Sequence, residues 1–205
     1  MQILTRLRPA LFPVTAVTVL VISLVAFRPS AEAQAQATAE RSMTADPAAT
    51  VADGINWMTF EEAMAAMEKE PKKVFIDLYT DWCGWCKKMD KNTFANGTVA
   101  AYMNDKFYAV KFDAEQKLPV VYKGKEYTFV PTGGRGYNQL AAELAAGRLS
   151  YPTTVYLDEN SDPIQAIPGY KDAYSMDKIL KFFGEDHYRN QTWVQFQETY
   201  VSPLR

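Results

Sequence analysis

The sequence contains few of the residues that build metal sites and disulfide scaffolds. It has two cysteines and one histidine among 205 residues. Two cysteines cannot form a disulfide-dense scaffold or, by themselves, supply the four ligands of a structural zinc site. An excess of charge of one sign is also lacking, because 22 Lys and Arg stand against 24 Asp and Glu. This balance argues against a nucleic-acid-binding protein, which usually has a strongly basic face.

The N-terminal segment has the composition of a secretory signal peptide. Met1–Arg8 carries two arginines and no acid, and the uncharged, largely apolar run Ala10–Phe27 follows. Overlapping Ala-x-Ala sites then occur within 31–37. This order is typical of an exported protein. We expect residues 1–33 to be removed as a signal peptide and the rest of the chain to be located in the bacterial periplasm. Because the apolar run is close to the length that spans a bilayer, an uncleaved anchor is the alternative.

Beyond the leader, the sequence predicts a linker, one domain and a short extension. Residues 34–52 are rich in Ala, Thr and Gln and show no apolar periodicity, which is typical of a flexible linker. The length of the remaining chain suits one ordinary domain, expected at residues 53–187 with a long insert at 116–149. Residues 188–205 are expected to form a helical extension that packs its aromatic side chains on the domain.

Apolar patterns within the domain predict an α/β fold. Thr59 and Glu62 form a capping box that begins a helix, which should end before Pro71. Val74–Tyr79 is an apolar run broken by one acid, Asp77, and this pattern is typical of a strand buried on both faces. Further predicted elements are a helix at 83–94, a turn at 96–97, a strand at 107–112, a hairpin with strands at 120–122 and 127–130, a turn at 133–136, a helix at 137–146, strands at 153–157 and 164–167, a helix capped by Ser175 that continues to 183, and a short helix at 193–200.

Both cysteines lie in one Cys-x-x-Cys motif, Cys83-Gly84-Trp85-Cys86, between a predicted buried strand and a predicted helix. A thiolate at a helix N-terminus faces unpaired N–H groups and the positive end of the helix dipole, which lowers its pKa. The two-residue spacing lets the second thiol attack a mixed disulfide formed by the first. We therefore favour a redox-active pair. A static disulfide is the alternative, although a four-residue loop constrains the unfolded chain only weakly.

The segment Val74–Lys87 resembles the strand and active-site helix of the thioredoxin superfamily, most specifically in its Trp-Cys-Gly-x-Cys-Lys block. Tyr151–Thr154 resembles the cis-proline segment of that family, and Gly169 lies where the family has a glycine near the substrate groove. The resemblance covers about Trp57–Phe183 and is strongest to exported bacterial thioredoxin-like proteins. It implies a thioredoxin-like α/β fold, with a central mixed sheet flanked by helices and the insert before the cis-proline strand.

The resemblance implies a chemical role for four residues. Cys83 would be the attacking thiol and Cys86 the resolving thiol, while Asp77 matches the buried acid of the family and Lys111 its lysine partner. A carboxyl in an apolar strand is costly to bury charged, so its pKa should rise, and it could then take the proton of Cys86. The alternatives are a hydrogen-bonded structural acid for Asp77 and a solvated strand-end lysine for Lys111.

The resemblance also implies a client-binding surface around the motif, formed by Trp82, Trp85, Tyr151, Pro152 and Gly169. We expect a thiol–disulfide oxidoreductase that reduces client disulfides and receives electrons from a membrane thiol relay, with no cofactor, no metal and no nucleic-acid partner. The Gly-Trp dipeptide and the tyrosine before the proline depart from the common family pattern, so the redox direction does not carry over. A dithiol oxidase or isomerase, and a non-catalytic copper(I)-binding or chaperone-like module, are the alternatives.

Overall fold

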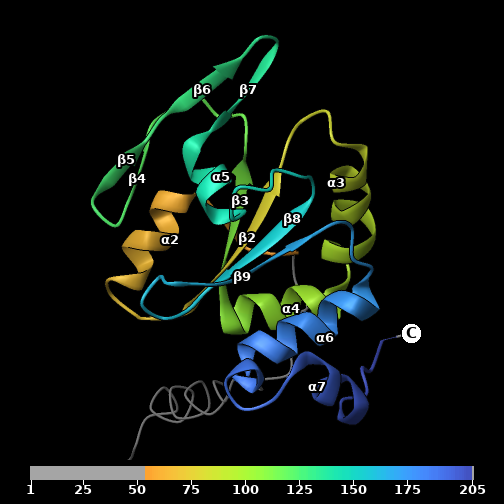
Figure 1. The fold of residues 1–205 in the computed structure, drawn as a ribbon. Helices are drawn as coiled ribbons and strands as arrows, with labels where there is room; N and C mark the ends of the chain where they lie inside the picture. The colour runs from red at the N-terminus through yellow and green to blue at the C-terminus, as the bar shows by residue number, and fades with distance from the viewer. Residues whose placement is uncertain (1–53, 205) are drawn as a thin grey trace, which may run out of the picture. The chain divides into compact units, whose positions relative to one another are not determined.

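The computed structural model describes residues 54–204, so the predicted signal peptide and linker lie outside the described residues (Figure 1). Its centre is a five-stranded sheet with the strand order β1-β3-β2-β8-β9. The β1–β3 and β2–β3 pairs are parallel, whereas β2–β8 and β8–β9 are antiparallel. The predicted mixed sheet of an α/β fold is therefore confirmed. The strands are β1 (Trp57–Met58), β2 (Lys73–Tyr79), β3 (Phe107–Asp113), β8 (Thr153–Leu157) and β9 (Pro163–Pro168).

Helices cover both faces of the sheet, and the central strand β2 is consequently buried on both sides. Val74, Ile76 and Leu78 point into the apolar cluster that also contains the buried residues of α2 and α5. Phe75 points into the opposite cluster, which contains buried residues of α3, α4 and α6. Figure 1 shows α2 on one side of the sheet and α4 and α6 on the other. The helices are α2 (Phe60–Met67), α3 (Gly84–Met89), α4 (Gly97–Lys106), α5 (Gln139–Leu144), α6 (Ala173–Gly184) and α7 (Trp193–Thr199).

The predicted capping box begins α2. The Thr59 hydroxyl oxygen accepts a hydrogen bond from the Glu62 N–H at 3.1 Å, and the Glu62 carboxylate accepts one from the Thr59 N–H at 2.8 Å. Each side chain thus satisfies a backbone donor that the first helical turn leaves free. The amphipathic helix that follows buries Phe60, Ala63 and Met67 against the sheet.

Three sequence-based boundaries were wrong, two of them because short polar side chains cap helices at other places. The predicted turn at Asn96 begins α4 instead, since its side-chain oxygen accepts hydrogen bonds from the next two free N–H groups at 3.0 and 3.2 Å. Asp172, rather than Ser175, caps α6 by accepting the Ser175 N–H at 2.8 Å. The predicted helix at 83–94 is α3 followed by a π-helical segment, η1 (Asp90–Phe94).

The insert folds as two small hairpins followed by α5. The first strand of the predicted hairpin is confirmed as β4 (Val120–Tyr122), but its partner is β5 (Lys125–Tyr127) rather than 127–130. A second hairpin pairs β6 (Phe129–Thr132) with β7 (Arg135–Asn138), so the predicted turn at 133–136 runs into a strand. Because β7 continues to Asn138, which caps α5, the helix begins later than predicted.

The β6–β7 hairpin projects beyond the sheet at the end of the molecule where α3 begins (Figure 1). Its two strands approach closely at Gly136. A Cβ atom at this position would lie 2.2 Å from the Phe129 ring and 2.5 Å from the Val130 carbonyl oxygen. Only glycine therefore fits this pairing without moving the backbone.

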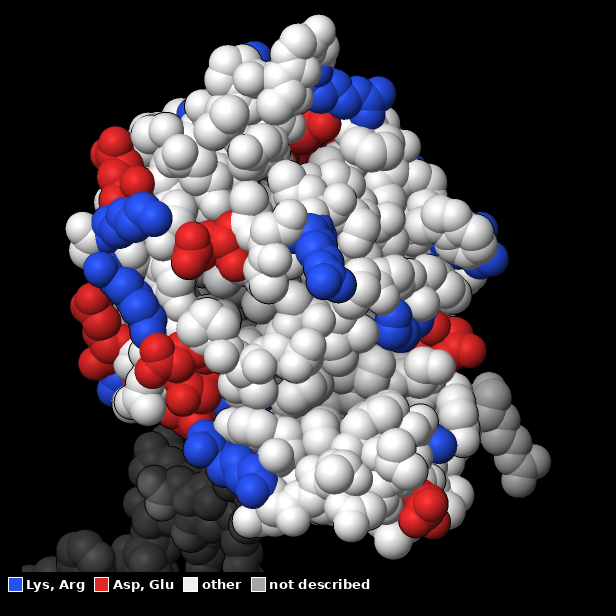
Figure 2. Space-filling view, viewed as in Figure 1, with Lys and Arg blue, Asp and Glu red and all other residues white. Residues whose placement is uncertain are grey.

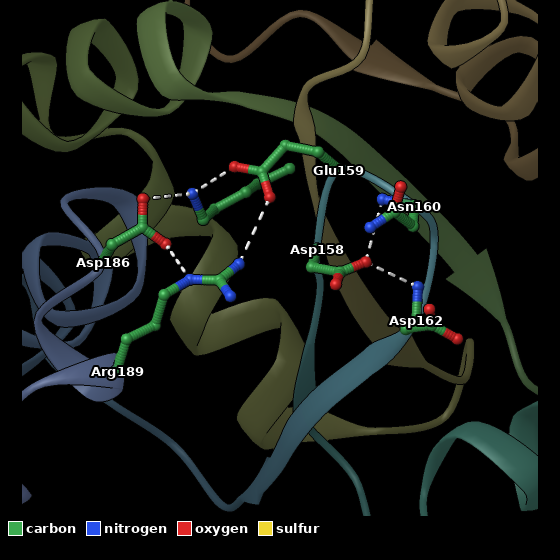
Figure 3. Close-up of polar contacts among 7 residues, drawn as sticks. Asp158, Glu159, Asn160, Asp162, Asp186 and Arg189 are labelled. Carbon is green, nitrogen blue, oxygen red and sulfur yellow. Dashed lines mark hydrogen bonds and ion pairs between the residues drawn. The ribbon is translucent and has the colours of Figure 1, made fainter.

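A network of ion pairs connects the start of β2 with the β8–β9 turn and the C-terminal part of the chain (Figure 3). Lys73 Nζ binds Glu159, in the β8–β9 turn, and Asp186, at 3.0 Å. Arg189 lies in the short helix η2 (His187–Arg189), and its Nε donates a hydrogen bond to the Asp186 carboxylate at 2.8 Å. Burial alone would lower the pKa of Lys73, but the two carboxylates raise it. The next helix after η2 is α7, and its residues, Trp193–Thr199, lie within the helix predicted at 193–200.

Candidate active site

The Cys-x-x-Cys motif lies directly after β2, where α3 begins. Cys83 and Cys86 form a disulfide. Cys83 is the N-cap residue of α3, and its sulfur accepts a hydrogen bond from the Cys86 N–H at 3.0 Å. The Cys83 sulfur thus faces the free N–H groups at the positive end of the helix dipole. The same contacts would stabilise a thiolate on Cys83 after reduction.

The two sulfurs lie beneath a surface that carries large aromatic rings. Cys83 is 4% exposed and Cys86 is 1% exposed, whereas Trp82 and Trp85 are 51% and 56% exposed. Monomeric proteins expose large contiguous apolar surfaces mainly where they bind another molecule. The structure therefore exposes two large indole rings directly beside the disulfide.

Lys111 links two carboxylates close to the motif. It lies directly opposite Asp77 in the parallel β2–β3 pair, and its Nζ donates to Asp77 Oδ2 at 2.7 Å. The same Nζ binds Asp90, whose backbone N–H donates to the Cys86 carbonyl oxygen. The lysine therefore connects the buried acid of β2 to the helical turn that follows Cys86.

Asp77 is fully buried, and burial raises its pKa from 3.8 to about 6. The charge of Lys111 opposes this rise, and the charge of Asp90 adds to it. Within residues 54–204, Asp77 Oδ1 and the hydroxyl of Thr80 are the buried side-chain oxygens that lack a hydrogen-bond partner. An unpaired oxygen in an apolar setting favours the protonated carboxyl. Asp77 can therefore change its protonation state close to neutral pH.

Lys111 itself is held by aromatic rings as well as by acids. Its Nζ lies 5.1 Å from the ring centroids of Trp57 and Tyr79 and 5.3 Å from that of Phe94. Burial alone would lower the pKa of Lys111, but its two carboxylate partners raise it. The interpretation as a solvated strand-end lysine is wrong, because the amine is bound on several sides.

The remaining predicted site residues lie beside the motif. The Tyr151–Pro152 peptide bond is cis, and the Tyr151 ring meets the Trp82 ring edge-on at 6.0 Å. The Gly169 N–H donates to the Pro152 carbonyl oxygen at 2.8 Å. Gly169 has a φ of +87°, a conformation that favours glycine. The structure thus joins these positions to the Cys-x-x-Cys surface.

Sequence reasoning missed four residues at this end of the molecule. The Arg135 guanidinium lies 4.2 Å from the centroid of the Trp82 ring, and the Trp82 indole N–H donates to Glu115 at 3.0 Å. The Tyr170 ring packs against Trp85 at 5.5 Å. Asp90, described above, is the fourth. Each contact joins residues far apart in the sequence, so no local pattern indicated it.

Within residues 54–204, no group of three or more His, Cys, Asp or Glu side chains could hold a metal ion. Over the same range, every helix is too short or too polar to cross a membrane.

Comparison with known proteins identifies the family. A family model described as a thioredoxin-like domain matches residues 60–184. The chain belongs to the thioredoxin-like family. Its Cys-x-x-Cys pair at the start of a helix, within a thioredoxin-like domain, supports thiol–disulfide oxidoreductase activity.

Three other proteins show how far this similarity extends. The chain is 29% identical over 111 residues to "Uncharacterized protein B0495.5" of Caenorhabditis elegans, covering 54% of this chain and 13% of that protein. It is 45% identical over 40 residues to "Thiol:disulfide interchange protein DsbD" of Pseudoalteromonas atlantica, covering 20% and 7%. The structure of "DsbH Oxidoreductase" has 17% identity and a TM-score of 0.48, covering 74% of this chain and 98% of that one. This thioredoxin-like chain therefore spans a small part of the first two relatives.

Proposed function

We propose that this chain is an exported thiol–disulfide oxidoreductase that reduces disulfides in client proteins through Cys83 and Cys86. The observation that carries the proposal is the hydrogen bond from the Cys86 N–H to the Cys83 sulfur at the start of α3. In the reduced protein, the Cys83 thiolate attacks one sulfur of the client disulfide, which forms a mixed disulfide and releases the first client thiolate. The Cys86 thiolate then attacks the Cys83 sulfur, releases the second client thiolate and re-forms the Cys83–Cys86 disulfide.

Asp77 is proposed to accept the proton of Cys86 in the second step. A thiol must become a thiolate before it can attack, and the cysteine thiol ordinarily has a pKa of about 8.5. Asp77, with a pKa of about 6, is mostly ionised at pH 7 and can take this proton. Lys111 acts as a positioning residue, since it binds Asp77 on one side and the helix of Cys86 through Asp90 on the other.

The client is proposed to bind over the exposed rings of Trp82 and Trp85 and against the backbone at Pro152. Tyr151 packs on Trp82, and Gly169 fixes the Pro152 carbonyl through its N–H. These contacts leave the large aromatic surfaces available to the client. A disulfide- or thiol-bearing polypeptide is therefore the expected partner.

The leader and the similarity to a thiol:disulfide interchange protein support the cellular setting. Residues 1–33 have the order of segments that directs export, with 10–27 as an anchor if cleavage does not occur. An exported compartment such as the periplasm has no glutathione buffer to restore the dithiol, so we propose a membrane thiol relay as the electron donor. Mass spectrometry of the native protein should find a new N-terminus between Ala33 and Ala37. An intact N-terminus in the membrane fraction would identify the anchored form.

The test of the function combines trapping and redox titration. A Cys86→Ser variant exported in cells should accumulate mixed disulfides with clients, and a matched Cys83→Ser variant should not. A reduction potential near about −270 mV, as in thioredoxin, supports reduction of clients, whereas about −120 mV, as in DsbA, would identify an oxidase. Stoichiometric copper(I) binding by a protein that exchanges no disulfides would identify the copper module instead.

A further inference from the structure

A groove of about 870 Å³ lies between strand β9 and helices α6 and α7. Among the strands of residues 54–204, β9 is at the edge of the sheet, so within this range one side of its backbone is not paired with another strand. The volume is within the range of about 300–1,000 Å³ that is usual for ligand sites. The lining contains no Asp or Glu, and its apolar part includes Ile164, Ile167, Ile179, Phe182 and Trp193.

One end of this groove reaches the Cys-x-x-Cys surface. Pro168 and Lys171 line that end, and the two residues between them contact the active site. The Gly169 N–H donates to the carbonyl oxygen of the cis-proline at 2.8 Å, and the Tyr170 ring packs against Trp85 at 5.5 Å. A chain bound over the disulfide can therefore continue past Gly169 into the groove.

Three lysines lie between the disulfide and the groove or in the groove lining itself. Lys88 Nζ lies 4.6 Å from the ring centroid of Trp85, at the disulfide end. Lys171 Nζ donates to two backbone carbonyl oxygens at 2.7 and 2.9 Å, and Lys178 Nζ lies 4.6 Å from the ring centroid of Tyr174. Within residues 54–204, none of these lysines forms an ion pair. Their positive charges are consequently available to a bound partner.

The surface around the groove agrees with this charge distribution. On the face drawn in Figure 2, the area over β9 and α6 is largely uncharged, with scattered Lys and Arg side chains and an acidic group at its right edge, near the start of α6. Several of the acidic side chains on this face lie instead towards its left side, near the β8–β9 turn. A partner that carries apolar and acidic side chains complements this surface, and a basic partner does not.

We propose that the groove binds the polypeptide segment next to the reacting cysteine of the partner protein, and that it selects an apolar segment with acidic residues. This inference rests on the proposed function, because it extends the client-binding surface from the disulfide along β9. The six residues of Pro163–Pro168 span about 20 Å at about 3.3 Å per residue, so the groove accommodates about six residues of extended chain. The apolar side chains of that segment contact α6, and its carboxylates contact Lys171 and Lys178.

The experiment compares model disulfide peptides in the full-chain protein. One short disulfide peptide serves as the core, and it is extended on either side by about six residues of alternating Leu and Glu, or of alternating Leu and Lys. Because partly exposed charge pairs are individually weak, we expect the acidic extension on one side to raise kcat/KM about 5–30-fold over the core. The basic extension should give no gain. Lys178→Gln should remove much of the gain, and the matched control Lys69→Gln, at an exposed lysine just beyond α2, should retain it.

A binding measurement separates this proposal from the proposed function. The acidic extension without any cysteine is titrated into the protein, and NMR shifts are followed at backbone amides of β9 and α6. Shifts confined to these elements support the groove proposal, whether or not the protein reduces disulfides. A protein that shows these shifts but reduces no disulfide would refute the proposed function alone. Equal kcat/KM for core, acidic and basic peptides, without shifts in β9 and α6, would overturn the groove proposal and leave the reductase intact.

Discussion

Replacement of Asp77 by asparagine tests how the fold and the chemistry are connected. Asparagine keeps the shape of the side chain but cannot hold a charge. The rise in the pKa of Asp77 from 3.8 to about 6 means that the ionised carboxyl costs the native state about 3 kcal/mol at neutral pH. Lys111 keeps its contact with Asp90 in the variant, so no buried cation loses all its partners. We expect Asp77→Asn to be more stable than the wild type at pH 7, by up to about 3 kcal/mol.

The pH dependence of this difference has a definite sign. A carboxyl whose pKa is raised in the native state stabilises the fold when protonated and loses that contribution as the pH rises. The wild type should therefore lose stability between about pH 4 and pH 6, while Asp77→Asn should not show this loss. Denaturant unfolding at pH 4 and pH 7 measures both free energies of unfolding. The two proteins should have similar stability at pH 4 and differ at pH 7.

The same variant should lose activity while it gains stability. Without Asp77 the Cys86 proton must pass to water, and we expect resolution of the mixed disulfide at pH 7 to slow by about 10–1,000-fold. Stopped-flow reduction of a model disulfide measures this rate. Asp81→Asn is the matched control, since Asp81 is exposed beside the motif. Unchanged turnover together with a loss of stability in Asp77→Asn would refute the reasoning and make Asp77 a structural acid.

Three other perturbations test separate parts of the site and the insert. Limited alkylation of the reduced protein at mildly acidic pH should label Cys83 before Cys86, since the Cys86 N–H at the helix N-terminus would stabilise a thiolate on Cys83; mass spectrometry showing the opposite order would exchange their roles. Asp90→Asn removes a negative charge that raises the pKa of Asp77, so the midpoint of the rate–pH profile should move to lower pH, and an unmoved midpoint would contradict this. Gly136→Ala should destabilise the β6–β7 hairpin by about 1–3 kcal/mol, measured as faster amide exchange in that hairpin; unchanged exchange would show that the strands can move apart freely.

The strand and motif at the centre of the site could be predicted because their signals are local. An apolar run with a single acid indicates a strand buried on both faces, and Asp77 is indeed fully buried in β2. The capping box at Thr59 is likewise a pattern of near neighbours, and it was confirmed. A helix was predicted directly after Cys83, where α3 begins.

The rest of the site depends on contacts that only the folded chain creates. Asp90, in η1, meets Lys111, which follows it by 21 residues and lies in β3 opposite Asp77, so the contact forms only when both segments are folded. The helix after Asn96 was missed because an Asn-Gly pair is a common turn signal, although the same asparagine side chain also caps helices. The groove forms where α6 and α7 meet β9, and no single segment of the sequence encodes it.

The two ends of β2 respond to acid in opposite ways. At its start, partial burial alone would raise the pKa of Asp186, but hydrogen bonds from Arg189 and Lys73 lower it below 3.8, so this ion pair persists in mild acid. Near its other end, Asp77 takes up a proton below about pH 6, which removes the cost of a buried charge and occupies the carboxylate that we propose as the acceptor of the Cys86 proton. Mild acidification should therefore convert the protein into a stable resting form with slow exchange, and a return to neutral pH should restore its activity without refolding.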